Sequence, residues 1–123
     1  MSRPLTIGWL PQPEPHDYPA AVSYLSLIYE SKRARRVINA LKLAPVIQFK
    51  AKDIFRASAL PQLGANNSHV EKDAKKIRAG LKLSPVLLVR DGATSRVIIA
   101  DGYHRVCAVY GFDEDALIPC KIV

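Results

Sequence analysis

Apolar residues in the first third of the chain recur with the period of an α-helix. Between Pro19 and Leu41 they fall into two groups, which predicts two consecutive helices. The preceding segment, residues 10–19, contains four prolines and predicts an extended connector, because proline removes amide donors and disfavours helical geometry in the residue before it. We therefore expect an extended arm over residues 1–18 and a helical extension over residues 19–44. The apolar positions are Val22, Leu25, Leu27 and Ile28, then Ala34, Val37, Ile38 and Leu41.

The middle of the chain combines a predicted strand with a predicted helix. PVIQFKAKDI, residues 45–54, has the composition of a strand and is followed by an irregular stretch. Ser68 and Glu71 have the spacing of a capping box, and Gly80 stands where a helix would stop. These signals predict a helix from about His69 to Ala79. Its apolar stripe consists of Val70, Ala74, Ile77 and Leu81.

The last third of the chain predicts a hairpin, a helix and a closing strand. SPVLLVRD and RVIIAD are rich in branched residues and are joined across Asp91-Gly92, a pair typical of hairpin turns. A helix is expected to begin near Gly102 and to stop at Gly111, and LIPCKIV then forms a last strand. The predicted fold class is α+β: a small mixed sheet packed with helices over residues 45–123, plus the N-terminal helical extension, in one compact domain.

Composition places the protein among water-soluble domains. No run approaches the roughly 18–20 apolar residues that a membrane span needs, so we expect no contact with a membrane. The N-terminal residues, with one basic residue and several prolines, do not resemble a targeting sequence, which predicts a cytoplasmic location. Two cysteines are too few for a disulfide framework, and we expect buried thiols.

The net charge of +7 is concentrated in one region of the sequence. Residues 31–82 contain 13 Lys and Arg against 3 Asp and Glu, whereas the rest of the chain carries a net charge of −3. Such a region attracts polyanions, although solvated helix faces of an ordinary protein have the same composition. The basic side chains of the second predicted helix are the candidate nucleic-acid contacts: Lys32, Arg33, Arg35 and Arg36.

The sequence ADGYHRVCAVYG places a dense polar group at a predicted strand-to-helix turn. Asp101 is expected near the N-cap, and Gly102 allows a tight bend and lets a ligand approach the backbone. The amides of Tyr103, His104 and Arg105 are first-turn donors, and the positive end of the helix dipole attracts anions. Arg105 adds a guanidinium that can grip phosphate, and His104 adds further donors. The turn is a candidate cradle for phosphate.

This turn resembles the box of the ParB/sulfiredoxin superfamily. The resemblance covers roughly residues 50–123 and centres on a G-x-H-R or G-x-R-R box at the same strand-to-helix turn. In ParB proteins the box contacts the triphosphate of CTP, and in the free serine kinase of this fold a D-G-H-x-R variant holds nucleotide phosphates. The resemblance therefore implies a ParB/sulfiredoxin-like fold and a nucleotide or phosphate site at Asp101 to Arg105.

Departures from the family pattern restrict the activity that can be carried over. Tyr103 stands where sulfiredoxin has its nucleophilic cysteine, which excludes reduction of sulfinic acids. No helix-turn-helix segment follows the last predicted strand, which argues against a full partition protein. The loop GANNSH lacks an acid that would match the kinase's catalytic glutamate, although Asp101 could still act as a base or a metal ligand.

The same loop is the second predicted wall of the site. In this superfamily the start of the helix after the first strand faces the box, so Asn66, Asn67, Ser68 and His69 could donate to a sugar or phosphate. The alternative is purely local: Ser68 is an N-cap and the asparagines serve a turn. Both interpretations stay open at this level.

Three functional hypotheses follow from the sequence. The first is a domain that binds ATP or CTP with Mg²⁺, either without catalysis or with hydrolysis or phosphoryl transfer. In this hypothesis Asp101 and His104 are the catalytic candidates, and Asp101 is also the metal ligand. The second is a DNA-binding or nuclease-like module that uses the basic segment. The third is a non-enzymatic interaction module, such as a toxin–antitoxin component, whose protein partner binds the N-terminal helices.

Overall fold

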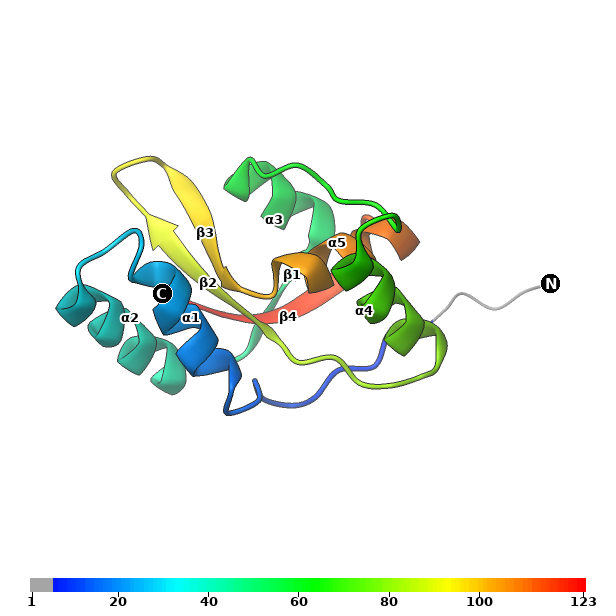
Figure 1. The fold of residues 1–123 in the computed structure, drawn as a ribbon, viewed down its shortest axis with the longest axis horizontal. Helices are drawn as coiled ribbons and strands as arrows, with labels where there is room; N and C mark the ends of the chain where they lie inside the picture. The colour runs from blue at the N-terminus through cyan, green and yellow to red at the C-terminus, as the bar shows by residue number, and fades with distance from the viewer. Residues whose placement is uncertain (1–5) are drawn as a thin grey trace.

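The computed structural model describes residues 6–123 and has an α+β architecture, as predicted (Figure 1). Helices on both sides enclose a mixed sheet. In that part of the chain no helix is both long and apolar enough to cross a bilayer. The elements, in order, are α1 (Asp17–Leu25), α2 (Ser31–Leu43), β1 (Ile47–Lys50), α3 (Ala51–Ser58), α4 (Ser68–Arg78), β2 (Val86–Asp91), β3 (Arg96–Asp101), α5 (Tyr103–Phe112) and β4 (Leu117–Ile122).

The sheet has the strand order β1-β4-β2-β3. β2 and β3 form the predicted antiparallel hairpin, with Asp91 opposite Arg96. β4 then returns through α5 to lie parallel to β2, and β1 pairs antiparallel with β4. This crossover places the start of α5 directly after the outer strand β3, so the polar turn lies at an edge of the sheet.

Each face of the sheet has its own hydrophobic core. Successive residues of β2 alternate between the two cores because strand side chains point alternately to opposite faces. Val86 and Leu88 pack with α3, α4 and α5, whereas Leu87 and Val89 pack with α1 and α2. The N-terminal helices therefore form one layer of the domain, and without them an apolar face of the sheet would be exposed to water.

Over residues 6–10 the N-terminal arm is extended, whereas bends at residues 11–12 and a turn at residues 15–16 interrupt the expected extended connector; the expected arm over residues 1–5 lies outside the described residues. Trp9 forms a parallel bridge with Leu83. The Leu10 amide donates to the Leu83 carbonyl at 2.8 Å, and the Leu83 amide donates to the Gly8 carbonyl at 2.9 Å. Ile7 and Trp9 pack against the core under α3, α4 and α5. The arm ends earlier than expected, since α1 begins at Asp17.

The predicted strand over residues 45–54 is wrong in its second half. β1 ends at Lys50, and AKDIFRAS forms α3 in place of strand and irregular chain. The buried residues of α3 are Ala51, Ile54, Phe55 and Ser58, whose spacing is helical. α3 follows β1 directly, with no glycine or proline between them. The helical spacing of its four buried residues is therefore difficult to separate from the apolar pattern of the strand.

Details of two other helices differ from the prediction. Asn67, not Ser68, is the N-cap of α4, and its side-chain oxygen accepts from the amides of His69 at 3.0 Å and Val70 at 3.2 Å. Leu81 lies beyond the end of α4 and is 55% exposed, so it does not belong to the buried stripe. Gly111 lies inside α5, which continues to Phe112.

Candidate functional site

The β3–α5 corner, residues 101–105, is the polar turn singled out by the sequence. Asp101 is the last residue of β3, and the N-cap of α5 is Gly102 rather than Asp101, with no side-chain capping bond. The first helical hydrogen bond runs from the Val106 amide to the Gly102 carbonyl at 3.0 Å. The three amides before it therefore have no acceptor within the helix, as expected for a helix start.

Glycine is required at position 102 for reasons internal to the fold. Its φ is +107°, in the left-handed region that favours glycine. A Cβ at this position would lie 2.5 Å from Cγ1 of Val86 and 2.8 Å from Nη2 of Arg105. The fold thus requires glycine at position 102 whether or not a ligand approaches the backbone there, as the sequence analysis expected.

Arg105 is turned toward two carboxylates. Its Nη2 donates to Oδ2 of Asp101 at 2.9 Å, and its Nη1 lies 3.8 Å from Oδ1 of Asp17. The side chain is only 16% exposed, and its Nε is buried without a hydrogen-bond partner in the described residues. The guanidinium therefore braces the corner from inside, whereas the sequence predicted a fork that is open to phosphate.

Asp17 is the residue of this site that the sequence analysis missed. It is 2% exposed at the start of α1, and its Oδ2 accepts from the Glu14 amide at 2.9 Å and from the Ser84 hydroxyl. It lies 88 positions from Arg105, and no local pattern links the two residues. Through Asp17 the N-terminal layer contacts the box directly.

The corner has more negative than positive formal charge. Burial raises the pKa of Asp101, Arg105 opposes that shift by attraction and hydrogen bonding, and the nearby Asp17 adds to it. One guanidinium thus faces two carboxylates. A multiply charged anion would meet a favourable helix end but no free cationic side chain within the triad of Asp17, Asp101 and Arg105.

His104 faces the start of α4. Its ring centre lies 4.8 Å from that of His69 and 5.5 Å from that of Tyr103. Burial lowers the pKa of His104 below 6.5, electrostatic repulsion from the neighbouring His69 ring lowers it further, and attraction to Asp73 opposes both. The lowered pKa favours the neutral form of His104, which can both donate and accept a proton. The Tyr103 hydroxyl donates to the Pro61 carbonyl, which fixes the neighbouring ring.

A cleft of about 450 Å³ opens beside the β3–α5 corner, and we call it the α5 cleft. Its buried floor is the end of β3, and its exposed walls come from α1 and from the loop after α3. Both a polar helix start and apolar walls thus face one space, and the volume is in the range of small-molecule sites. The lining residues are Ala20, Tyr24, Leu60, Ile99, Ala100, Asp101, Gly102, Tyr103 and His104.

The predicted second wall contributes less than expected. Asn66, Asn67 and Ser68 do not line the α5 cleft, and the side-chain oxygen of Asn67 is occupied by capping α4. The helix start does approach the box through the fourth residue predicted for this wall, His69, whose ring lies 4.8 Å from that of His104 and is tilted by 32°. The local interpretation placed the cap on Ser68, which is wrong, since Asn67 caps the helix.

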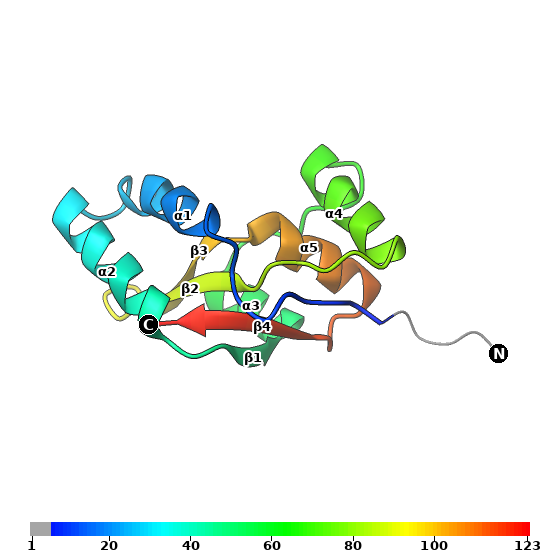
Figure 2. The ribbon, with the colours of Figure 1, turned by 90° about the horizontal axis from the view of Figure 1, so that it is seen from below.

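The basic region is divided between two ends of the molecule. Figures 1 and 2 show α2 at one end of the long axis and α4 toward the other. The four predicted contacts on α2 are all exposed: Lys32, Arg33, Arg35 and Arg36. The charge excess of residues 31–82 therefore does not form one continuous basic face.

Neither a metal cluster nor a reactive thiol accompanies the corner. Over residues 6–123 no group of three or more His, Cys, Asp or Glu side chains is arranged to hold a metal ion. Cys107 and Cys120 are free and buried, and burial raises the pKa of both thiols, that of Cys120 to about 12. Asp101 is thus the one carboxylate lining the α5 cleft.

Comparison with known proteins gives no assignment, because no family model, no curated protein and no solved structure matches the chain.

Proposed function

We propose that the chain binds a nucleotide or another phosphate ligand in the α5 cleft, with a phosphate at the first turn of α5. The observation that carries the proposal is the joining of unpaired helix-start amides to a cleft with apolar walls. Tyr24 and Leu60 offer surfaces for a base, and His104 offers a neutral imidazole to a phosphate oxygen. The resemblance of the D-G-Y-H-R box to the ParB/sulfiredoxin superfamily supports the same assignment.

The charge of the corner favours a ligand that brings its own cation. Asp17 and Asp101 already exceed the charge of Arg105, so a free triphosphate would be repelled more than its Mg²⁺ complex. Asp101 is the carboxylate nearest to such an ion at the cleft, and His104 is the candidate acid or base for hydrolysis or phosphoryl transfer. Arg105 acts by holding Asp101 in place.

A thermal-shift panel tests the proposal. ATP, CTP and GTP, each with Mg²⁺, are compared with inorganic phosphate at millimolar concentration. A ligand present at 100 times its Kd stabilises the native state by about 2.7 kcal/mol, which raises the melting temperature of a domain of this size by several degrees. A panel in which no compound moves the transition overturns the proposal.

His104→Glu with His69→Glu as its matched control locates the site. A carboxylate in the first turn of α5 favours the helix dipole, so His104→Glu is expected to preserve the fold while repelling phosphate. His69 stacks on His104 but does not line the cleft. We expect His104→Glu to abolish the nucleotide shift and His69→Glu to retain most of it. Equal loss in both variants would contradict a phosphate position at α5.

A nucleic-acid interface on α2 is the second proposal. Lys32, Arg33, Arg35 and Arg36 are exposed on a helix whose opposite side, including Ala34 and Ile38, is buried. Because α4 lies toward the other end, the contact would involve few phosphates and bind weakly. Duplex binding whose salt dependence is unchanged after all four residues are replaced by glutamine would exclude α2 as the contact.

A protein partner on the N-terminal helices is the third proposal. The apolar stripe of α2 is buried against the sheet, so such a partner would meet the outer side of the layer, where Leu27 is 85% exposed. The proposed compartment stays the cytoplasm, since two buried free cysteines are typical of reducing conditions.

A further inference from the structure

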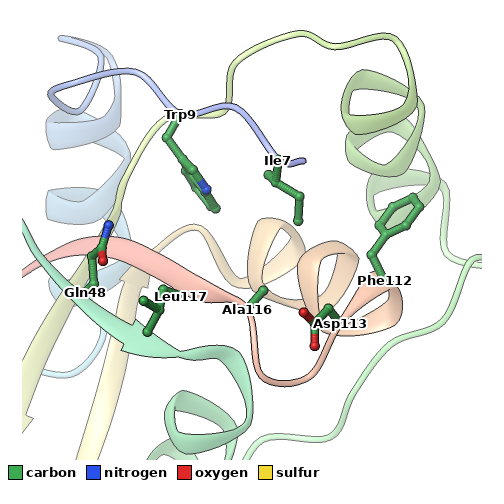
Figure 3. A pocket seen from close by; sticks show the side chains of 7 residues that line it. All are labelled: Ile7, Trp9, Gln48, Phe112, Asp113, Ala116 and Leu117. Carbon is green, nitrogen blue, oxygen red and sulfur yellow. The ribbon is translucent and has the colours of Figure 1, made fainter. Parts of the chain in front are cut away.

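A second cleft, of about 460 Å³, lies between the N-terminal arm and the sheet (Figure 3). We call it the Trp9 cleft. The side chains of Ile7 and Trp9 reach from the arm toward Ala116 and Leu117, while Gln48 and Asp113 lie at opposite ends. Phe112 completes the lining, and none of these residues lines the α5 cleft.

The walls of the Trp9 cleft are built by fixed main chain. The two hydrogen bonds between the arm and Leu83 flank Trp9 and hold its backbone in place. On the opposite side Leu117 belongs to β4, which pairs with β1. Leu117 is 51% exposed and Phe112 is 38% exposed, so apolar and aromatic surface is open to a ligand.

Asp113 gives the cleft a negative end. Its Oδ1 accepts from the Asp115 amide at 2.9 Å, and no cation among residues 6–123 lies within ion-pair distance of its carboxylate. The nearby Lys52 and Lys50 are directed to Asp115, at 2.6 and 3.9 Å. Among the described residues, this cleft therefore combines an aromatic wall with a carboxylate that has no ion-pair partner.

We propose that the Trp9 cleft binds a small organic cation, an ammonium group joined to an apolar or aromatic body. The carboxylate of Asp113 attracts the ammonium, and the indole of Trp9, which lies toward the Gln48 end, packs against the apolar body. The apolar body packs between Ile7 and Leu117. The volume of the cleft suits a ligand of this size. This site is independent of the proposed phosphate site.

The single tryptophan of the chain reports binding directly. The full-length protein is titrated with 2-phenylethylamine, a cation at pH 7, and with 2-phenylethanol, its neutral analogue of nearly equal shape. We expect a saturable change in Trp9 fluorescence and up to about fivefold tighter binding of the amine, the effect of one exposed ion pair. Amide and indole NMR shifts confined to the Trp9 cleft confirm the location.

Asp113→Asn is the decisive variant, and Asp115→Asn is its matched control. Asparagine keeps an oxygen that can accept from the Asp115 amide, so the loop is expected to retain its turn. Asp113→Asn should remove the preference for the amine, whereas Asp115→Asn, which loses the pair with Lys52, should keep it. The proposal is overturned by equal affinities for amine and alcohol, by equal effects of the two variants, or by the absence of a saturable change.

Discussion

At the scale of single residues, Arg105 is expected to contribute to stability because it pairs with both Asp17 and Asp101. It separates two carboxylates of which Asp17 is almost fully buried, and its own side chain is 16% exposed. Replacing it by methionine preserves much of the volume but leaves Asp17 and Asp101 facing each other. We expect Arg105→Met to lower the free energy of unfolding by about 3 kcal/mol, as for a buried pair that loses one partner. Urea denaturation measures the loss.

A double-mutant cycle separates the ion pair from packing. If the charge of Asp17 is what Arg105 compensates, Asp17→Asn should relieve part of the damage in the Arg105→Met background. The double variant should then lose less stability than the sum of the single variants. Strict additivity, or a loss below about 1 kcal/mol in Arg105→Met, would mean that the triad does not brace the corner.

His104 provides a prediction about protonation. Its pKa is lowered by burial first and by His69 second. The unfolded chain therefore binds a proton more readily, so this group reduces stability as the pH falls below about 6.5 and has no effect well above it. NMR titration of the three histidines should place His104 below its ordinary value of 6.5.

Two neighbouring variants should move that pKa in opposite directions. His69→Gln removes a positive neighbour and should raise the pKa of His104 part of the way, because burial persists. Asp73→Asn removes a negative neighbour and should lower it further. If the pKa of His104 changed in the same direction in both variants, or in neither, the charges of these two α4 residues would not determine it.

Residues also show how far the sequence alone could predict the site. The box from Asp101 to Arg105 was recognisable because glycine, histidine and arginine stand together at a helix start. Asp17 was not, because its pairing with Arg105 is made by the packing of α1 against β3 and leaves no trace in local spacing. The second carboxylate beside Arg105, and hence the charge balance of the corner, comes from that long-range contact.

At the scale of elements, two glycines of α5 should respond oppositely to alanine. Gly102 has φ +107° and Val86 lies where a Cβ would go, so Gly102→Ala should destabilise the protein by at least about 2 kcal/mol. Gly111 lies in the helix with open space around its Cα, so Gly111→Ala should stabilise by up to about 1 kcal/mol. Thermal unfolding of the pair tests whether the turn conformation is obligatory; equal effects would refute it.

Element boundaries were predictable where a chemical signal marks them. Gly80, with φ +75°, ends α4 as expected, and its amide donates to the Ile77 carbonyl at 3.1 Å. α3 was missed because Lys50 and Ala51 join strand to helix without glycine or proline. Asn67 caps α4, one residue before the predicted cap Ser68. Asparagine and serine are both favourable N-caps, so local propensity does not distinguish two adjacent candidates.

At the scale of the whole molecule, the sheet separates two hydrophobic cores and links them through its strands. Leu41 of α2 is fully buried in the core that also contains Leu87 and Val89. Trp9 packs against the other core, on the opposite face of the same strands. A defect in one core should therefore be transmitted through the sheet to the other, so that the protein unfolds in a single transition.

Leu41→Ala tests this cooperativity. Removing a fully buried leucine side chain should lower the free energy of unfolding by about 2–5 kcal/mol. If the domain is one unit, the denaturation midpoint seen by Trp9 fluorescence falls together with that seen by far-UV circular dichroism, although Trp9 lies in the other core. Ile77→Ala, in the core that Trp9 contacts, is the matched variant and should shift both signals equally. In Leu41→Ala, a Trp9 transition that stays in place while the circular dichroism shifts would contradict this expectation. It would show that α1 and α2 unfold on their own. The contact between Asp17 of α1 and Arg105 would then be lost while the rest of the domain stays folded.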